Sequence, residues 1–238
     1  MEKTERKQSE RIQTSLLNPG EKVVLGAIVR KLPSWVTSDQ LTGLGVVGAL
    51  MIAIGYALTY LRPEWLWLAN LGFFVNWFGD SLDGTLARHR NQQRPLYGFY
   101  IDHNLDCVCT FLMVAGAGMS AYMSLWSSLL IIVPYLMLDV FVMINAHLKN
   151  EFRLTFAKLG PTELRLIIVV ANSVLYFSPA LQAWSCQVSF LGKDHTLMAL
   201  DVVGMSISFI LTIIYFVSLW QDAQYYGRID PLVKKKED

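Results

Sequence analysis

Charged residues are scarce in this chain of 238 residues. Asp, Glu, Lys and Arg make up 16% of it, whereas an average soluble domain has about 25%. Cysteines number three, too few and too scattered to predict a disulfide framework. We find no internal repeat and no low-complexity tract. These shortages exclude a disulfide-stapled secreted domain and a typical soluble enzyme.

Hydrophobic residues, by contrast, make up 53% of the chain. They gather in runs long enough to cross a bilayer, for which a helix needs about 20 residues. The sequence therefore predicts an all-α, polytopic membrane protein with six transmembrane helices. We expect these spans near residues 41–61, 65–83, 98–119, 125–147, 160–178 and 196–219, with a loop over 180–194.

Three regions follow from this layout. Residues 1–40 form an N-terminal segment, residues 41–222 form the six-helix membrane domain, and residues 223–238 form a tail. Within the first region, Glu21–Leu32 has apolar residues on one side and basic residues flanking them. This pattern is typical of an amphipathic helix in the membrane interface, and equally of a short helix packed on the protein itself. We expect Ser38 or Asp39 to cap the first span.

The distribution of basic residues predicts the orientation of the chain. Eighteen of the 20 Lys and Arg residues fall on the side of both termini, and Arg62 and Lys193 fall on the other. Basic residues favour the cytoplasmic side. We therefore expect a multi-pass protein whose termini, and the loop between its second and third spans, face the cytoplasm. We expect the membrane to be a bacterial inner membrane.

Four aspartates lie where two predicted spans meet this loop. Asp80 and Asp83 end the second span, and Asp102 and Asp106 begin the third. An ionised Asp deep in a bilayer costs about 2.5–3.5 kcal/mol, so a compensating charge is needed. A helix advances about 100° per residue, which places each pair on one stripe, and the two spans are antiparallel neighbours. Facing carboxylates supply the oxygen ligands that Mg²⁺, Mn²⁺ or Ca²⁺ prefer.

Small residues and an arginine accompany these acids. Gly84, Ala87 and Gly98 leave space for a ligand to approach the backbone. Arg88 carries a planar guanidinium that can bind a phosphate through two hydrogen bonds. Together with a metal, these residues describe a diphosphate site. The reaction that fits is displacement at phosphorus, in which one carboxylate takes a proton from the nucleophile.

The same residues resemble the signature of the CDP-alcohol phosphatidyltransferase family, D-x2-D-G-x2-A-R-x8-G-x3-D-x3-D. Nine residues, rather than eight, separate Arg88 from Gly98 here. The extra residue lies in the loop, where it alters loop shape more than the acidic positions. The matching positions are Asp80, Asp83, Gly84, Ala87, Arg88, Gly98, Asp102 and Asp106.

The resemblance implies a membrane enzyme of phospholipid biosynthesis with six helices and a cytosol-facing site. Such an enzyme moves a substituted phosphoryl group from a CDP-alcohol to an acceptor alcohol and releases CMP. The resemblance also implies a role for each matching residue. Two Mg²⁺ or Mn²⁺ ions would be held by Asp80, Asp83, Asp102 and Asp106, with Asp106 also the catalytic base, and CDP would be bound by Gly84, Ala87, Arg88 and Gly98.

The donor and the acceptor stay open. His103 gives Asp-His-x-x-Asp, which is similar to the branch that uses a CDP-aminoalcohol with diacylglycerol, whereas other branches use CDP-diacylglycerol. Glu163 and Arg165 begin the fifth span, so they either hold the acceptor's polar group or act as a helix-start acid and an interfacial arginine. We expect membrane lipids and a second copy of the chain as partners, and no nucleic acid.

Two other classes of membrane protein also use acidic side chains at their functional sites. A membrane prenyltransferase binds a prenyl diphosphate through Mg²⁺, but its two acidic motifs should lie far apart in sequence. A cation transporter would place acids and helix breaks near the bilayer midplane. Among the remaining polar residues, we expect Asp201 to be structural and Asn76 to support Asp80 or simply pack. We expect Asp139 and Asn145 to line the cavity, with hydrogen bonding between helices as the alternative for Asn145.

Overall fold

The computed structural model describes residues 10–12, 17–149, 151–153, 160–190 and 192–232. The remaining parts of the predicted N-terminal segment and tail lie outside the described residues. Most described residues are helical, as the sequence predicted. The described ranges contain eight α-helices: α1 (Asn18–Val29), α2 (Ser38–Ala57), α3 (Leu66–His89), α4 (Pro95–Gly118), α5 (Leu125–Lys149), α6 (Pro161–Phe177), α7 (Pro179–Gln182) and α8 (Ala199–Ile229).

Short elements join and flank these helices. Two 3₁₀ turns, Leu58–Tyr60 and Pro63–Trp65, connect α2 to α3. Two strand pairs complete the described chain: β1 (Glu10–Ile12) is parallel to β2 (Glu151–Arg153), and β3 (Ser185–Phe190) is antiparallel to β4 (Lys193–Met198).

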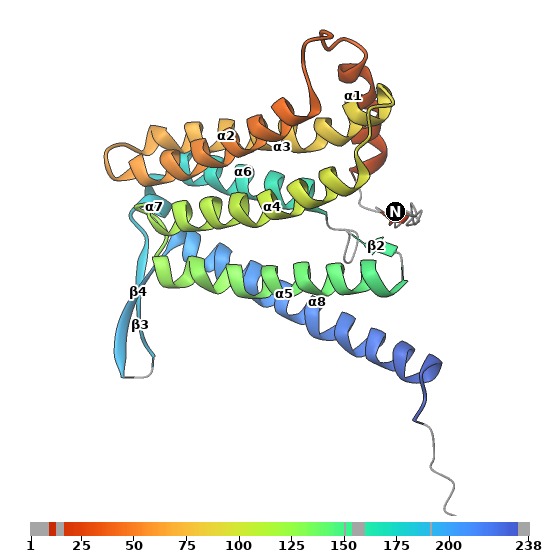
Figure 1. Ribbon diagram of the computed structural model, residues 1–238. Helices are drawn as coiled ribbons and strands as arrows, with labels where there is room; N and C mark the ends of the chain where they lie inside the picture. The colour runs from red at the N-terminus through yellow and green to blue at the C-terminus, as the bar shows by residue number, and fades with distance from the viewer. Residues whose placement is uncertain (1–9, 13–16, 150, 154–159, 191, 233–238) are drawn as a thin grey trace, which may run out of the picture.

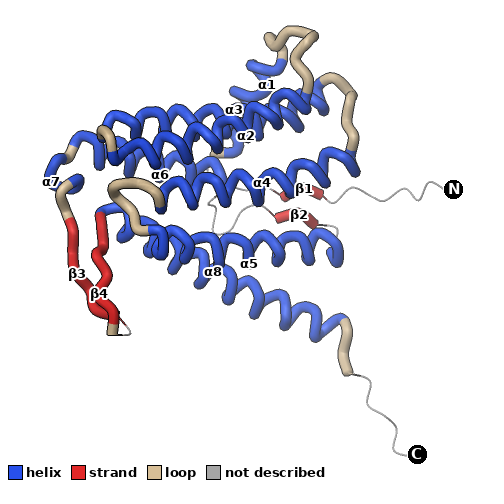
Figure 2. Tube along the Cα trace, turned by 60° about the vertical axis from the view of Figure 1, so that its left-hand side comes forward, coloured by secondary structure: helices blue, strands red, loops and turns tan. Residues whose placement is uncertain are grey.

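The long helices form an elongated bundle with two distinct ends (Figure 1). Helix α2 packs against α3 and α4, α6 packs against α3, and α5 packs between α4 and α8. Helix α1 lies across one end, which we call the α1 end, together with the start of α2, the end of α3 and the start of α4. The β3–β4 hairpin and α7 lie at the opposite end, the hairpin end (Figure 2). Helix α8 diverges from the bundle along its C-terminal half.

Helices α2 and α3 approach until their backbones touch. A Cβ added at Gly48 would lie closer than 3.0 Å to the Asn76 backbone, and one added at Gly79 would come equally close to the Leu41 carbonyl. Small residues permit such close contact between membrane helices. Gly43 faces away, with open space around it. The close contact of α2 with α3 thus uses Gly48, and Gly43 takes no part in it.

Apolar contacts attach α1 to the bundle. Leu25 and Val29 of α1 are buried against Leu41, Leu82 and Leu86 of α2 and α3. Val23 and Val24 on the other face of α1 are exposed. Of the two interpretations of this segment, packing on the protein is therefore present, while its contact with a membrane stays a prediction.

Six long helices stand where six spans were predicted. Three of them are long and apolar enough to cross a membrane, judged by length and composition over the described residues: Ser38–Tyr60, Leu125–Leu148 and Ala199–Ile229. Helices α3, α4 and α6 do not meet that measure, so their crossing of the membrane stays a prediction. The all-α, membrane-type architecture is confirmed at this coarser level.

Several predicted boundaries were wrong. The segment 180–194 is not a simple loop but contains α7 and most of the β3–β4 hairpin, which turns at Gly192 with a φ of +74°. Helix α8 starts at Ala199, where the Asp201 carboxylate accepts the Met198 N–H. It runs ten residues beyond the predicted end, because its polar last turns continue the helix into the region predicted as tail.

The caps of two site-bearing helices also differ from prediction. Thr37 caps α2, since its hydroxyl accepts the Gln40 N–H and the Gln40 side chain accepts the Thr37 N–H. This reciprocal capping box satisfies two helix-start donors, and it leaves Ser38 and Asp39 free for tertiary contacts. Helix α4 begins at Pro95 rather than near Gly98, because proline suits the first turn of a helix.

Candidate functional site

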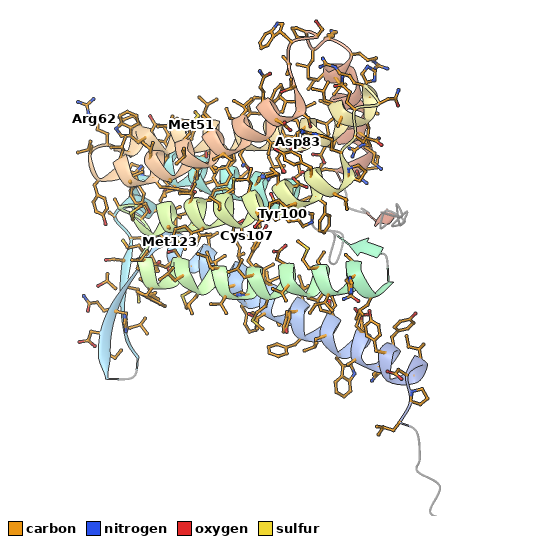
Figure 3. The ribbon with its side chains drawn as sticks, in the orientation of Figure 1. Met51, Arg62, Asp83, Tyr100, Cys107 and Met123 are labelled. Carbon is orange, nitrogen blue, oxygen red and sulfur yellow. The ribbon has the colours of Figure 1, made fainter. Side chains whose placement is uncertain are left out.

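Four aspartates of α3 and α4 gather at the α1 end of the bundle. Asp80 and Asp83 lie on α3, and Asp102 and Asp106 lie on α4, which returns antiparallel after a short loop. One ligand atom from each of Asp80, Asp102 and Asp106 lies within 4.8 Å of the others. The structure thus brings three of the four sequence-selected acids together. Figure 3 shows Asp83 near this end, far from Arg62 at the hairpin end.

A small polar cavity lies among these acids. Its volume is about 20 Å³, and all four aspartates line it together with residues of α2, α3 and α4. A volume of this size holds about one water-sized species. The other lining residues are Thr42, Gly45, Val46, Asn76, Leu105 and Cys109.

Asp83 is held differently from the other three acids. Its Oδ2 accepts a hydrogen bond of 2.6 Å from the Thr42 hydroxyl, and its Oδ1 accepts the Gly84 N–H. The Ser38 hydroxyl also donates to the Asp83 carbonyl at 2.8 Å. Asp83 therefore lines the cavity while being fastened to α2, which its helical spacing alone did not reveal.

Arg165 supplies a positive charge to the cluster. Its Nη2 lies 2.8 Å from Asp80 Oδ2, and the side chains are 17% and 28% exposed. Asp80 and Arg165 are separated by 85 positions in the sequence. The sequence left Arg165 as either a contact for the acceptor or an interfacial arginine, and the structure pairs it directly with one of the acids.

Asn76 leaves an acceptor atom at this cavity. Its Nδ2 donates to the Gly45 carbonyl at 2.9 Å, and the residue is only 2% exposed. Its Oδ1 is buried and has no hydrogen-bond partner in the part of the chain that the structure describes. A buried polar atom of this kind calls for a water or an ion. Three converging carboxylates and this amide oxygen form a hard-oxygen donor set, which fits Mg²⁺ or Mn²⁺.

The residues proposed to bind CDP lie on the neighbouring turns. Arg88 is exposed, and its Nη2 donates to the Thr85 hydroxyl at 3.2 Å. A Cβ at Gly84 would lie 3.3 Å from Arg88 Nη1, so Gly84 gives the arginine room. Gly98 is exposed in the first turn of α4 with open space around it. Ala87 is half-buried on α3.

The other two arginines of this region anchor the chain. Arg90 donates to backbone carbonyls between α1 and α2, including Pro33 O at 2.8 Å and Val36 O. Arg94 forms an ion pair with Asp39 at the start of α2, and this hydrogen bond raises the pKa of the Arg94 guanidinium above its ordinary value. Three neighbouring arginines that look equivalent in the sequence therefore have different surroundings.

The structure does not bring His103 or Glu163 to the cavity lining. His103 Nδ1 lies 2.8 Å from the Phe99 carbonyl one turn earlier, and its ring packs on Phe99. The buried Glu163 accepts the Gly160 N–H and the Leu17 N–H, both at 2.9 Å. Glu163 thus acts as a helix-start acid, which is one of the two interpretations that the sequence left open.

Glu21 of α1 was missed by the sequence analysis. Its Oε1 accepts hydrogen bonds from Trp77 Nε1 at 2.7 Å, Ser81 Oγ at 3.2 Å and Thr162 Oγ1 at 3.0 Å. These donors come from α3 and α6, far from Glu21 in the sequence. A glutamate in the first turn of a helix is common for reasons of the helix dipole alone, so no sequence signal distinguished it.

Asp201 confirms the expectation of a structural acid. It is fully buried, and its Oδ1 accepts the Ser124 N–H at 2.8 Å and both the Ser124 and Ser127 hydroxyls. Its Oδ2 accepts the Met198 N–H at 2.7 Å. The carboxylate thereby joins the starts of α5 and α8 at the hairpin end.

Two further polar residues, both on α5, form hydrogen bonds to other helices. Tyr226 of α8 donates to Asn145 Oδ1 at 2.9 Å, and the Cys107 thiol of α4 donates to Asp139 Oδ2 at 3.6 Å. Neither Asp139 nor Asn145 lines the acid cavity. The structure therefore supports the interhelical interpretation of Asn145, and it pairs Asp139 with Cys107 of α4 instead of placing it at the cavity lining.

Several known proteins are similar to this chain in sequence. It is 26% identical to Cholinephosphotransferase 1 of Homo sapiens over 196 residues, which cover 80% of this chain and 47% of the relative. It is 24% identical to the protein of the same name from Danio rerio over 197 residues (80% and 51%) and 27% identical to that from Bos taurus over 202 residues (81% and 49%). The chain spans about half the length of these relatives.

A family model matches most of the chain. The model describes the CDP-alcohol phosphatidyltransferases and matches residues 32–220, a range that includes α2 to α6 and most of α8. The acid-bearing turns of α3 and α4, with the cavity between them, lie inside this range. The chain belongs to the CDP-alcohol phosphatidyltransferase family.

Proposed function

We propose that this chain is an integral membrane phosphotransferase of phospholipid synthesis. It transfers a substituted phosphoryl group from a CDP-alcohol to an acceptor alcohol and releases CMP. The observation that carries the proposal is the convergence of the Asp80, Asp102 and Asp106 carboxylates at one small cavity. Family membership favours this function over a prenyltransferase or a cation transporter.

The acids give the site its affinity for divalent cations. Asp80, Asp83, Asp102 and Asp106 would hold Mg²⁺ or Mn²⁺, in a two-ion site, and the ions would neutralise charge on the donor's diphosphate. Three of these acids already converge, and Asp83 lines the same cavity. The orphaned Asn76 oxygen is a further acceptor for a bound water there.

Proton transfer is assigned to Asp106. Its carboxylate takes the proton of the acceptor hydroxyl, whose oxygen then bonds to the β-phosphorus of the CDP-alcohol. The bond from that phosphorus to the oxygen bridging it to CMP breaks, and CMP leaves with the bonding electron pair. Arg88 holds a phosphate oxygen through its guanidinium, while Gly84, Ala87 and Gly98 leave room for the nucleotide.

The CDP-aminoalcohol branch is the donor class that we favour. His103 follows Asp102 in an Asp-His-x-x-Asp pattern, and the relatives named above are cholinephosphotransferases. Diacylglycerol would then be the acceptor. CDP-diacylglycerol with a polar acceptor is the competing assignment.

The arrangement in the membrane follows the charge distribution. Arg62 and Lys193 lie in the connections at the hairpin end, whereas the basic loop between α3 and α4 lies at the α1 end. We place the α1 end and both termini in the cytoplasm on this basis, with α2 to α6 and α8 as six spans. The lipid substrate enters sideways from the bilayer.

One experiment separates the donor classes. Purified protein in phospholipid vesicles receives Mn²⁺ and either labelled CDP-choline with diacylglycerol, or labelled CDP-diacylglycerol with a panel of polar alcohols. We expect label in phosphatidylcholine and equimolar release of CMP. Product only from CDP-diacylglycerol would reverse the donor assignment, and no release of CMP from either donor would contradict the proposed function.

A further inference from the structure

Helix α1 is fastened to α3 and α6 by two carboxylates, one on α1 and one on α6. Glu21 of α1 accepts hydrogen bonds from α3 and α6. Glu163 of α6 accepts the Leu17 N–H just before α1. The apolar contacts of Leu25 and Val29 add to this attachment. Helices α1 and α6 are thus held together at the same end of the bundle as the acids.

The donors to Glu21 lie beside the residues that set the charge of the cavity. On α3, Ser81 directly follows Asp80, and Trp77 lies about one turn before it. On α6, Thr162 lies about one turn before Arg165. Residues three or four positions apart share a helix face. One carboxylate oxygen of Glu21 therefore links the turn that presents Asp80 to the turn that presents Arg165.

The contact between Asp80 and Arg165 joins α3 to the first turns of α6, which also packs on α3 directly. Helix α3 is fixed by its backbone contact with α2, and α4 is packed on α2 as well. The cluster of Asp80, Asp102 and Asp106 therefore does not need α1 for its assembly. Arg165 comes from α6, whose start is bonded to α1 through Thr162 and Glu163.

We propose that Glu21 is a positioning residue that holds α6 so that Arg165 stays against Asp80. This inference rests on the proposed function, because it takes the acid cavity as the site of the divalent cations. A guanidinium 2.8 Å from Asp80 opposes a second cation at the same carboxylate. Releasing Arg165 therefore strengthens cation binding while the acid cluster stays intact.

The test measures binding of Mn²⁺ to the purified full chain in detergent by electron paramagnetic resonance. Glu21→Ala removes the acceptor of all three donors, and we expect Mn²⁺ to bind about fivefold more tightly. Glu21→Gln keeps an Oε1 acceptor for the same donors and should retain the wild-type affinity. Lys22→Ala is the matched control, since Lys22 is the exposed neighbour of Glu21 on α1.

A double-variant cycle shows whether Glu21 acts through Arg165. Arg165→Ala should tighten Mn²⁺ binding by itself, and adding Glu21→Ala should then change nothing further. If Glu21→Ala does not fold, Thr162→Val breaks the link to α6 alone and should shift the affinity in the same direction. Unchanged or weaker binding in the folded variants, or additive effects in the double variant, would overturn the inference. Wild-type protein that binds no Mn²⁺ would instead contradict the proposed function.

Discussion

The surroundings of aspartate differ between the two ends of the bundle. At the hairpin end, Asp201 stands among donors from Met198, Ser124 and Ser127, which occupy both of its oxygens. At the α1 end, Asp80, Asp102 and Asp106 point at one another. One carboxylate is surrounded by groups that satisfy it, while three others lie close enough to repel one another, with the Arg165 guanidinium against one of them.

This difference separates a structural acid from a functional one. A carboxylate that accepts several hydrogen bonds from helix starts stabilises the fold. Carboxylates held together against their repulsion raise the energy of the empty site, and proteins retain such arrangements where a ligand relieves them. Substitutions at the two ends should therefore have opposite consequences for activity and for stability.

The largest effect should come from Asp106→Asn at the α1 end. Loss of the proposed base should lower CMP release roughly 10²–10⁴-fold. Replacing one of the crowded acids by a neutral isostere also reduces repulsion, so the unfolding temperature should be equal to or above that of the wild type. Activity and thermal unfolding would be measured on the same detergent-purified protein.

Asp194→Asn provides the control for this substitution, because Asp194 is an exposed acid on the β3–β4 hairpin. It should leave both activity and stability unchanged. An Asp106→Asn protein that releases CMP at the wild-type rate would contradict the base assignment. One that unfolds at a much lower temperature would show that the acids at the α1 end are structural too.

The reverse result is expected for Asp201→Ala at the hairpin end. Removing this carboxylate leaves buried donors of α5 and α8 without an acceptor, and each such group costs about 1–3 kcal/mol. We expect the free energy of unfolding to fall by about 2–5 kcal/mol in total. Equilibrium unfolding in mixed micelles would measure the loss. The fraction that remains folded should bind Mn²⁺ with wild-type affinity. A weaker affinity for Mn²⁺ would show that the two ends of the bundle are coupled.

Features that depend on local spacing could be predicted from the sequence. The helical positions of Asp80, Asp83, Asp102 and Asp106, and the short loop between their helices, are sufficient to place two acidic stripes opposite each other. The apolar runs likewise predicted the long helices. The structural role of Asp201 followed from its distance to the acidic motif.

Contacts between distant segments could not be predicted in this way. Arg165 reaches Asp80 across 85 positions, and Glu21 reaches Thr162 across 141; nothing local in either helix selects these partners. The β3–β4 hairpin was missed although polar and apolar residues alternate along Ser185–Phe190, because its partner run Lys193–Met198 shows no such alternation. Thr37 displaced Ser38 and Asp39 as the cap because Gln40 completes its capping box.

Binding of a cation should stabilise the α1 end and leave the hairpin end unaffected. A ligand at about 100 times its dissociation constant adds about 2.7 kcal/mol of stability to the form that binds it. Mn²⁺ should therefore raise the unfolding temperature of the wild type and of Asp194→Asn. Asp102→Asn removes one of the converging carboxylates, so its unfolding temperature should respond weakly or not at all. An equal rise in all three proteins would place the cation elsewhere.

The smallest effects should come from removing one donor at each end. Ser127→Ala deletes a hydroxyl that donates to Asp201, so it should lower stability by about 1 kcal/mol and leave CMP release unchanged.

Thr42→Val is nearly isosteric and deletes the donor to Asp83 Oδ2. It should change stability by less than about 1 kcal/mol, but it frees an oxygen that lines the acid cavity, so the Mn²⁺ concentration for half-maximal activity should shift. If both substitutions shifted the Mn²⁺ requirement, or if both changed only stability, the contrast between the two ends would be wrong, because a hydrogen bond to an acid would then have the same effect in both places.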